Sequence, residues 1–170
     1  MAKPLIEEYP VFFKTYMDMI PENGDLLDQL ENSLELFEQL LYEVAENKQE
    51  FRYDLGKWTI KEVVQHMIDV ERVFVYRALR FSRNDKTVLR GFDENDYVSR
   101  YEINRRDFVV LLDEFCLLRR ATILMFKDFG NEILDRRGEV EGAALSVRAL
   151  GYICSGHVLH HLQVIRERYL

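Results

Sequence analysis

Three of the four histidines of this 170-residue chain lie close together near its C-terminal end, as His157, His160 and His161. Side chains four residues apart stack on one face of a helix, so His157 and His161 can present two imidazoles to one point. His157 and His160, three apart, also share a face. Such pairs can be metal ligands, or they can be partly buried and hydrogen-bonded, because histidine is intermediate in burial. The spacing alone leaves both interpretations open.

The fourth histidine, His66, lies far away in the sequence, in another strongly amphipathic segment. A lone histidine on such a helix is usually structural. Helical bundles, however, build metal sites in their cores from side chains on facing helices. Two imidazoles from the terminal segment and one from His66 would form a three-histidine site with a coordination position left for water or substrate. We therefore predict that the two segments meet in space and hold a metal ion.

Four amphipathic segments are expected to position these histidines. Their apolar residues recur at intervals of three and four, which is typical of helices with one buried face. The second segment has an explicit start, since Thr59 and Glu62 fit a capping box and Trp58 and Val63 fit a hydrophobic staple. Ser146 is a plausible N-cap for the last segment. The predicted helices span about 25–48, 60–82, 104–129 and 147 to the C-terminus.

The segments between these helices differ in character. Residues 84–104 lose the periodicity and form a long connection, of the kind that often serves as a lid or wall of a site. Residues 132–145 predict a turn or small hairpin. Residues 1–23 predict an extended N-terminal arm that packs Phe12, Phe13 and Tyr16 on the body. The expected fold is all-α, a four-helix bundle with a long connection between helices 2 and 3, and its connection order stays open.

Composition limits the classes of function. The length fits a single domain over 1–170. A net charge of −7 disfavours nucleic-acid binding, which draws its affinity from Lys and Arg. No apolar run is long enough to predict a membrane span, and the N-terminus does not resemble a signal peptide, so we expect a cytoplasmic protein. Cys116 and Cys154, far apart in apolar surroundings, predict buried reduced thiols.

Three stretches together resemble the DinB/YfiT-like superfamily. Lys57–Arg72, followed by Tyr76 and Arg77, resembles that family's block with a Trp, a Lys-Glu pair and a histidine. Gly156–His161, closing on Ile165–Tyr169, resembles its terminal GH-x-x-HH segment. Gly91–Glu94 and Tyr97 fit the loop between its second and third helices. The stretches read KWTIKEVVQHMIDVER, GHVLHH and GFDE.

The resemblance implies an up-and-down-type four-helix bundle with a divalent metal held by three histidines, which match His66, His157 and His161. It thus selects His161 over His160. Imidazole ligands suit several metals, with Zn or Ni favoured and Fe or Mn as alternatives. Members of the family include S-transferases that use bacillithiol or mycothiol, a mycothiol-dependent isomerase and many proteins of unknown activity. Family membership does not fix the reaction.

We therefore expect a metal-dependent enzyme that activates a low-molecular-weight thiol, or water, for attack on a small-molecule substrate. Asp69 and Glu71 are candidates for a general base or for hydrogen-bond partners of the ligand histidines, although Glu71 could equally be a solvated charge. Arg72, Arg77 and Arg148 could bind carboxylates or form structural ion pairs. The alternatives are a metal-dependent hydrolase and a non-catalytic, metal-stabilised module that binds a small ligand or forms a homodimer.

Overall fold

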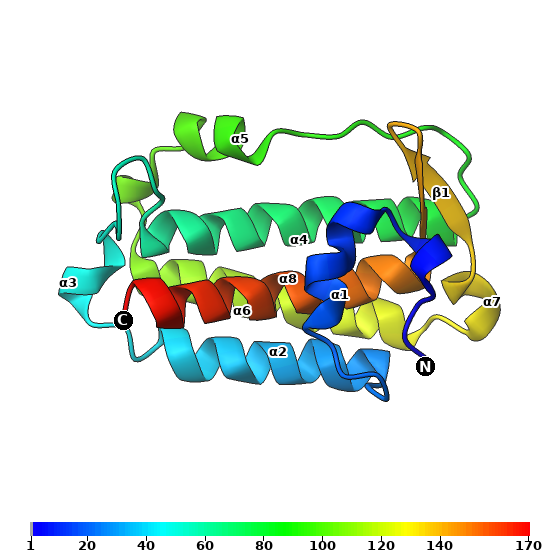
Figure 1. Ribbon diagram of the computed structural model, residues 1–170, viewed down its shortest axis with the longest axis horizontal. Coiled ribbons are helices and arrows are strands. Elements are labelled where there is room, and N and C mark those ends of the chain that lie inside the picture. Colours follow the sequence, from blue (N-terminus) through cyan, green and yellow to red (C-terminus); the bar gives the residue numbers. More distant parts are fainter. Residues whose placement is uncertain (1) are drawn as a thin grey trace.

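The computed structural model describes residues 2–170, apart from the side chain of Asn104. Its main feature is the predicted bundle of four long helices (Figure 1). These helices are α2 (Leu26–Leu41), α4 (Ile60–Ser82), α6 (Phe108–Lys127) and α8 (Val147–Arg168). The shorter elements are η1 (Ile6–Glu8), η2 (Val11–Phe13), α1 (Lys14–Asp18), α3 (Glu46–Gln49), α5 (Glu94–Arg100), η3 (Ile103–Arg105), α7 (Asn131–Leu134), β1 (Arg137–Val140) and β2 (Ala143–Ser146).

The order of the helices differs from a simple up-and-down bundle. Helices α4 and α6 run in the same direction, and the chain between them crosses the length of the bundle (Figure 1). Helices α8 and α6 each pack against both α2 and α4. In cross-section, α2 and α4 therefore lie at opposite corners of the bundle, and so do α6 and α8. The arrangement makes α4 and α8 neighbours although they are far apart in the sequence. The two histidine-bearing segments therefore meet, as predicted.

The predicted starts of α4 and α8 are confirmed. Thr59 Oγ1 accepts from the backbone N–H of Glu62 at 3.1 Å, and Glu62 Oε2 accepts from the N–H of Thr59 at 2.7 Å. Arg52 donates to the same carboxylate, which ties the preceding loop to the helix. Ser146 caps α8 by accepting from the N–H of Ala149 at 2.9 Å. The first turns of α4 and α8 are thus fixed by local side-chain chemistry.

Two helix boundaries differ from those predicted. The first long helix ends at Leu41, before 48, and the separate turn α3 follows. This break lets Lys48 donate to the carbonyl of Tyr169 at 2.9 Å, across the end of the bundle. The third helix begins at Phe108 rather than near 104, because the carboxylate of Asp107 accepts from backbone N–H groups of the first turn and caps it there.

The long connection between α4 and α6 is a wall anchored on a hairpin. Strands β1 and β2 pair antiparallel in the region predicted to form a hairpin. The hairpin turns at Glu141 and Gly142, both with positive φ, as two-residue hairpin turns require. Leu89 joins it, donating to the carbonyl of Glu139 at 2.9 Å and accepting from the N–H of Glu141 at 3.1 Å. These bonds fix the connection on one side of the bundle.

The N-terminal arm, as far as the structure describes it, is a series of short helical turns and not an extended segment. Phe13 is buried and Tyr16 is half-buried, as predicted. The prediction that Phe12 packs on the body is wrong, since its side chain is 67% exposed. Successive residues of a tight turn point in different directions, so Phe13 and Phe12 cannot both face the core.

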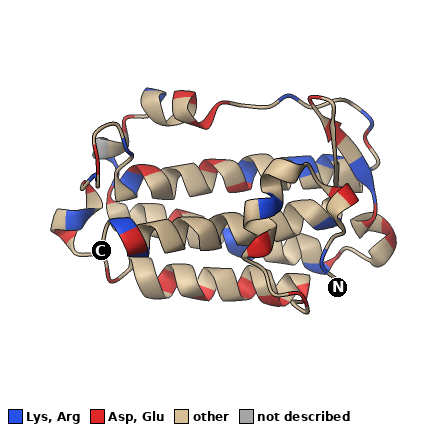
Figure 2. Ribbon diagram, viewed as in Figure 1, with Lys and Arg blue, Asp and Glu red and all other residues tan. Residues whose placement is uncertain are grey.

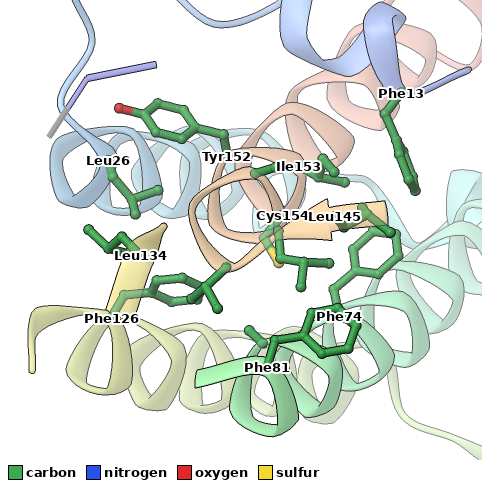
Figure 3. Close-up of a cluster of buried hydrophobic side chains, with 14 of the residues drawn as sticks. Phe13, Leu26, Phe74, Phe81, Phe126, Leu134, Leu145, Tyr152, Ile153 and Cys154 are labelled. Atoms are coloured by element: carbon green, nitrogen blue, oxygen red, sulfur yellow. The ribbon is translucent and has the colours of Figure 1, made fainter. Parts of the chain in front are cut away.

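The core consists of two apolar clusters, one toward each end of the bundle. The first contains Phe13, Phe74, Phe81, Phe126 and Leu145, and Figure 3 shows these side chains converging between the helices and the hairpin. Cys116 and Cys154 are buried free thiols, as predicted. Acidic residues recur along α2, and in the view of Figure 2 basic residues lie interspersed with acidic ones. No helix in the described part combines the length and apolar character needed to cross a membrane.

A buried ion pair links all four long helices. Arg119 on α6 is fully buried and pairs through two hydrogen bonds of 2.8 Å with Glu71 on α4. The same guanidinium donates to the hydroxyl of Ser33 on α2 at 2.5 Å and to the carbonyl of Cys154 on α8 at 3.0 Å. A charge removed from water needs such partners, because its desolvation is costly.

We expect Arg119→Met to lower the free energy of unfolding by roughly 3–5 kcal/mol, because it leaves the carboxylate of Glu71 buried without a counter-charge. The double variant Arg119→Met/Glu71→Leu should recover much of this loss, since no charge is then stranded. Chemical denaturation followed by circular dichroism measures both. A double variant as unstable as the single one would contradict this explanation.

Candidate metal centre

The structure brings together the side chains of His66, His157 and His161. His66 projects from α4, and the other two project from α8, one turn apart. The Nε2 atom of His157 lies 2.9 Å from Nε2 of His66 and 3.0 Å from Nε2 of His161. One possible ligand atom from each residue lies within 4.8 Å of the other two. His160, which the resemblance set aside, is not part of this cluster.

Aromatic rings hold the imidazoles in place. The ring of Trp58, in the staple position before α4, lies 4.9 Å from the ring of His66. Tyr16 of α1 makes an edge-to-face contact with His157 at 5.3 Å between ring centroids. His66 and His157 are buried, and the ring of His161 packs against the rings of His66, His157 and His160. Packing therefore constrains all three rings before any ligand binds.

The electrostatics of the cluster favour neutral imidazoles. Burial lowers the pKa of His66 to about 4, and the neighbouring His160 contributes in the same direction. Burial likewise holds the pKa values of His157 and His161 well below the usual range, and the mutual repulsion of the protonated rings adds to this effect. A neutral imidazole keeps a lone pair, which metal coordination requires.

The donor set fits a divalent cation. A ring nitrogen has one in-plane position, occupied by either a proton or a lone pair, so Nε2 of His157 cannot form good hydrogen bonds to both neighbours. A cation would instead accept all three lone pairs. His66, His157 and His161 would hold such an ion through these three nitrogens.

The histidines lie at one side of a cavity of about 500 Å³. Its walls are mainly apolar and come from α4, α8, the N-terminal arm, the hairpin and the long connection. The connection thus forms part of the wall, as predicted. Charge in the cavity comes from Arg77, Glu94 and Glu141. The other lining residues are Pro10, Phe12, Phe13, Tyr16, Trp58, Val70, Phe74, Gly91, Phe92, Val140, Ala143 and Leu145.

The two carboxylates proposed from the sequence do not line this cavity. Asp69 accepts from Gln65 at 2.9 Å, and burial raises its pKa. Glu71 is buried against Arg119 at the centre of the bundle. Sequence reasoning missed the carboxylates that do line the cavity, Glu94 and Glu141. Glu94 lies in the GFDE stretch, but no local pattern indicates that Glu141 lines the cavity.

The three arginines considered from the sequence have different environments. Arg72 pairs with Glu114 at 2.5 Å, and Arg148 pairs with Asp135. Both therefore form ion pairs with the protein itself. Arg77 alone among them lines the cavity with the histidines.

Gly156, which precedes His157, has a packing reason for its size. A Cβ atom there would lie 2.2 Å from the carbonyl oxygen of Tyr16 and 2.7 Å from its carbonyl carbon. Only glycine therefore lets α1 approach α8 closely enough for Tyr16 to contact the histidine ring.

This combination defines a class of protein, a four-helix bundle with a buried histidine cluster suited to a metal and open to a cavity. The chain belongs to the DinB superfamily, whose family model matches residues 29–165. It is similar to the structure of YfiT from Bacillus subtilis, described as a probable metal-dependent hydrolase with an unusual four-helix bundle topology. That match has 17% identity and a TM-score of 0.72, and covers 96% of this chain and 98% of YfiT. No curated protein matches the chain.

We predict that His161→Ala loses bound divalent metal, because it removes one of the three converging nitrogens. His160→Ala should retain the metal, since that ring packs against Tyr16 and lies outside the cluster. Metal analysis of the purified variants, with circular dichroism as a check on folding, distinguishes the two. The reverse result would refute this choice of ligand.

Gly156→Ala should destabilise the protein by about 1–3 kcal/mol, because the new methyl group meets backbone and not a flexible side chain. Alanine is the better helix former, so the clash must outweigh a gain of about 1 kcal/mol. Thermal or chemical unfolding measures the change. Gly130→Ala, where a Cβ meets nothing within 4 Å, is the control and should cost less. Equal stability of the Gly156→Ala variant would show that α1 does not pack as described.

Proposed function

We propose that this chain is a metal-dependent enzyme that activates a low-molecular-weight thiol for transfer to an electrophilic small molecule. The observation that carries the proposal is the convergence of His66, His157 and His161 beside a largely apolar cavity. A divalent ion bound by these imidazoles would lower the pKa of a thiol or water at its remaining position, which supplies a nucleophile near neutral pH. Zn and Ni are the favoured metals, with Fe and Mn as alternatives.

The protein's own residues support this role in two ways. His66, His157 and His161 are held neutral by burial and so stay available as ligands. The rings of Phe13, Trp58 and Phe74 line the cavity, and such an apolar lining would favour attack by a thiol over attack by water.

We also propose which residues accept the proton of the nucleophile. Glu94 and Glu141 line the cavity and are better placed to receive a proton there than Asp69 or Glu71. The role of Asp69 or Glu71 as a general base stays a prediction from the sequence. In the structure, Asp69 is bonded to Gln65 and Glu71 is paired with Arg119.

Hydrolysis is the second candidate, with water in place of the thiol at the same site. The description of YfiT as a probable metal-dependent hydrolase favours it. The third candidate is a non-catalytic, metal-stabilised binding module. Among the described residues, the hydrogen bonds of the three histidines join them to one another and not to a carboxylate that could serve as a base, which favours this candidate. A single domain, a homodimer and a cytoplasmic location stay predictions from the sequence.

The test is turnover by protein loaded with Zn or Ni. We expect the loss of free thiol from cysteine, glutathione or coenzyme A in the presence of 1-chloro-2,4-dinitrobenzene or an epoxide to require the metal. The rate should fall by about 100-fold or more in His66→Ala, whose folding is verified by circular dichroism. Metal-dependent release of nitrophenol from p-nitrophenyl acetate without thiol consumption would instead favour the hydrolase. Metal-dependent stabilisation with neither reaction would contradict both catalytic proposals.

A further inference from the structure

Arg77 is a buried cation inside the cavity that also holds the histidines. Its side chain is 6% exposed, and it lines the cavity wall. Arg77 follows His66 by eleven residues on α4, which is close to three full turns, so both side chains project from the same face of the helix. The helical spacing and the cavity lining therefore place Arg77 on the same cavity wall as His66, and Arg77 also lines a neighbouring hollow with Arg90 and Phe92.

The protein provides little to neutralise this charge. Among the described residues, Arg77 forms one hydrogen bond, from Nη2 to the carbonyl of Arg90 at 3.1 Å, although a guanidinium carries five N–H donors. No described carboxylate lies within ion-pair distance of it, whereas Arg72 pairs with Asp69 and Glu114 and Arg148 pairs with Asp135. Burial lowers the pKa of Arg77, and the more distant Glu141 opposes that effect. A buried charge without a paired counter-ion is costly, so its retention calls for a partner that binds.

An apolar surface separates Arg77 from the histidines. The ring of Phe74 lies 5.7 Å from Cζ of Arg77 and 6.4 Å from the ring of His157. The ring of Phe92 also lies near the guanidinium, 6.0 Å from Cζ of Arg77. Phe74 therefore lies near both the guanidinium and the histidine cluster, and a molecule that spans its ring would reach both.

We propose that Arg77 binds a carboxylate of the small molecule that enters this cavity, and so selects ligands with an anionic end and an apolar body. The planar guanidinium matches a carboxylate through two parallel hydrogen bonds, which Lys cannot reproduce. Glu94 and Glu141 on the same walls disfavour a second anionic group elsewhere on the ligand. This inference rests on the proposed function for the identity of the site, but binding can be measured without turnover.

The experiment measures binding of a matched pair of probes to the metal-loaded protein by titration calorimetry. The probes are 4-phenylbutyrate and its neutral amide, 4-phenylbutanamide, which differ only in the charge of one end. Wild-type protein should bind the carboxylate at least about tenfold more tightly than the amide. Arg77→Met should abolish this preference by weakening carboxylate binding alone, and Arg77→Lys should restore only part of it.

The matched control is Arg72→Met, five residues away on the same helix, whose guanidinium pairs with Glu114. It should keep the full preference for the carboxylate. Because a carboxylate could also contact the metal directly, the decisive quantity is the change in preference between the wild type and the Arg77→Met variant, with metal content held equal. If Arg77→Met does not fold, Arg77→Lys takes its place, and a preference that is undiminished in that variant would overturn the inference.

Equal affinity of the wild type for both probes, or a preference that survives Arg77→Met, would overturn the inference. A preference that depends on Arg77 in a protein that turns over no thiol or ester would support the binding inference while refuting the proposed enzyme function. Metal-dependent turnover by a protein whose probe binding does not depend on Arg77 would support the proposed enzyme function and refute the binding inference. The two proposals can therefore fail separately.

Discussion

The ion pair between Arg119 and Glu71 sets the relative positions of the four long helices. Its hydrogen bonds reach α2, α4 and α8 from a single guanidinium on α6. Glu71 lies little more than one turn from His66, and Cys154, which accepts from Arg119, lies within one turn of His157. The pair therefore fixes the register of α4 against α8 close to where the imidazoles meet. Because other registers would leave these buried charges unpaired, we expect the pair to disfavour them.

The metal centre depends on this register and on the packing around it. His66 and His157 are buried among aromatic rings, and Gly156 lets α1 approach α8 and cover them. Burial keeps the imidazoles neutral, so the same packing that orients the rings also preserves their lone pairs. The cavity then adds an apolar wall and a single buried cation. Under the two proposals above, this arrangement would bind a metal and a small molecule with one anionic end with little rearrangement of the protein.

The sequence predicts those features that arise from local chemistry. The capping box at Thr59 and Glu62, the N-cap at Ser146, the hairpin and the helical periodicity all follow from neighbouring residues. The histidine cluster was predicted from spacing together with a family resemblance, which selected His161. Boundaries near 41 and 108 were missed because they depend on contacts across the end of the bundle and on the competing cap Asp107.

Long-range arrangements could not be predicted in the same way. Glu71 was considered as a catalytic group, and only the fold shows that it pairs with Arg119, a residue 48 positions away. Glu141 reaches the cavity only because the hairpin is held against the long connection. Arg72, Arg77 and Arg148 are equivalent in type, and tertiary contacts alone distinguish the one that faces the cavity from the two that are paired.

The central claim, that three imidazoles converge on one divalent ion, is tested most directly by X-ray absorption spectroscopy of the metal-loaded protein. We predict one ion per chain with three imidazole nitrogens at about 2.0–2.1 Å and at least one further ligand from solvent. Addition of a small thiol should then introduce a sulfur neighbour at about 2.3 Å. A spectrum with fewer than three imidazoles, or binding at less than one ion per chain, would contradict the claim.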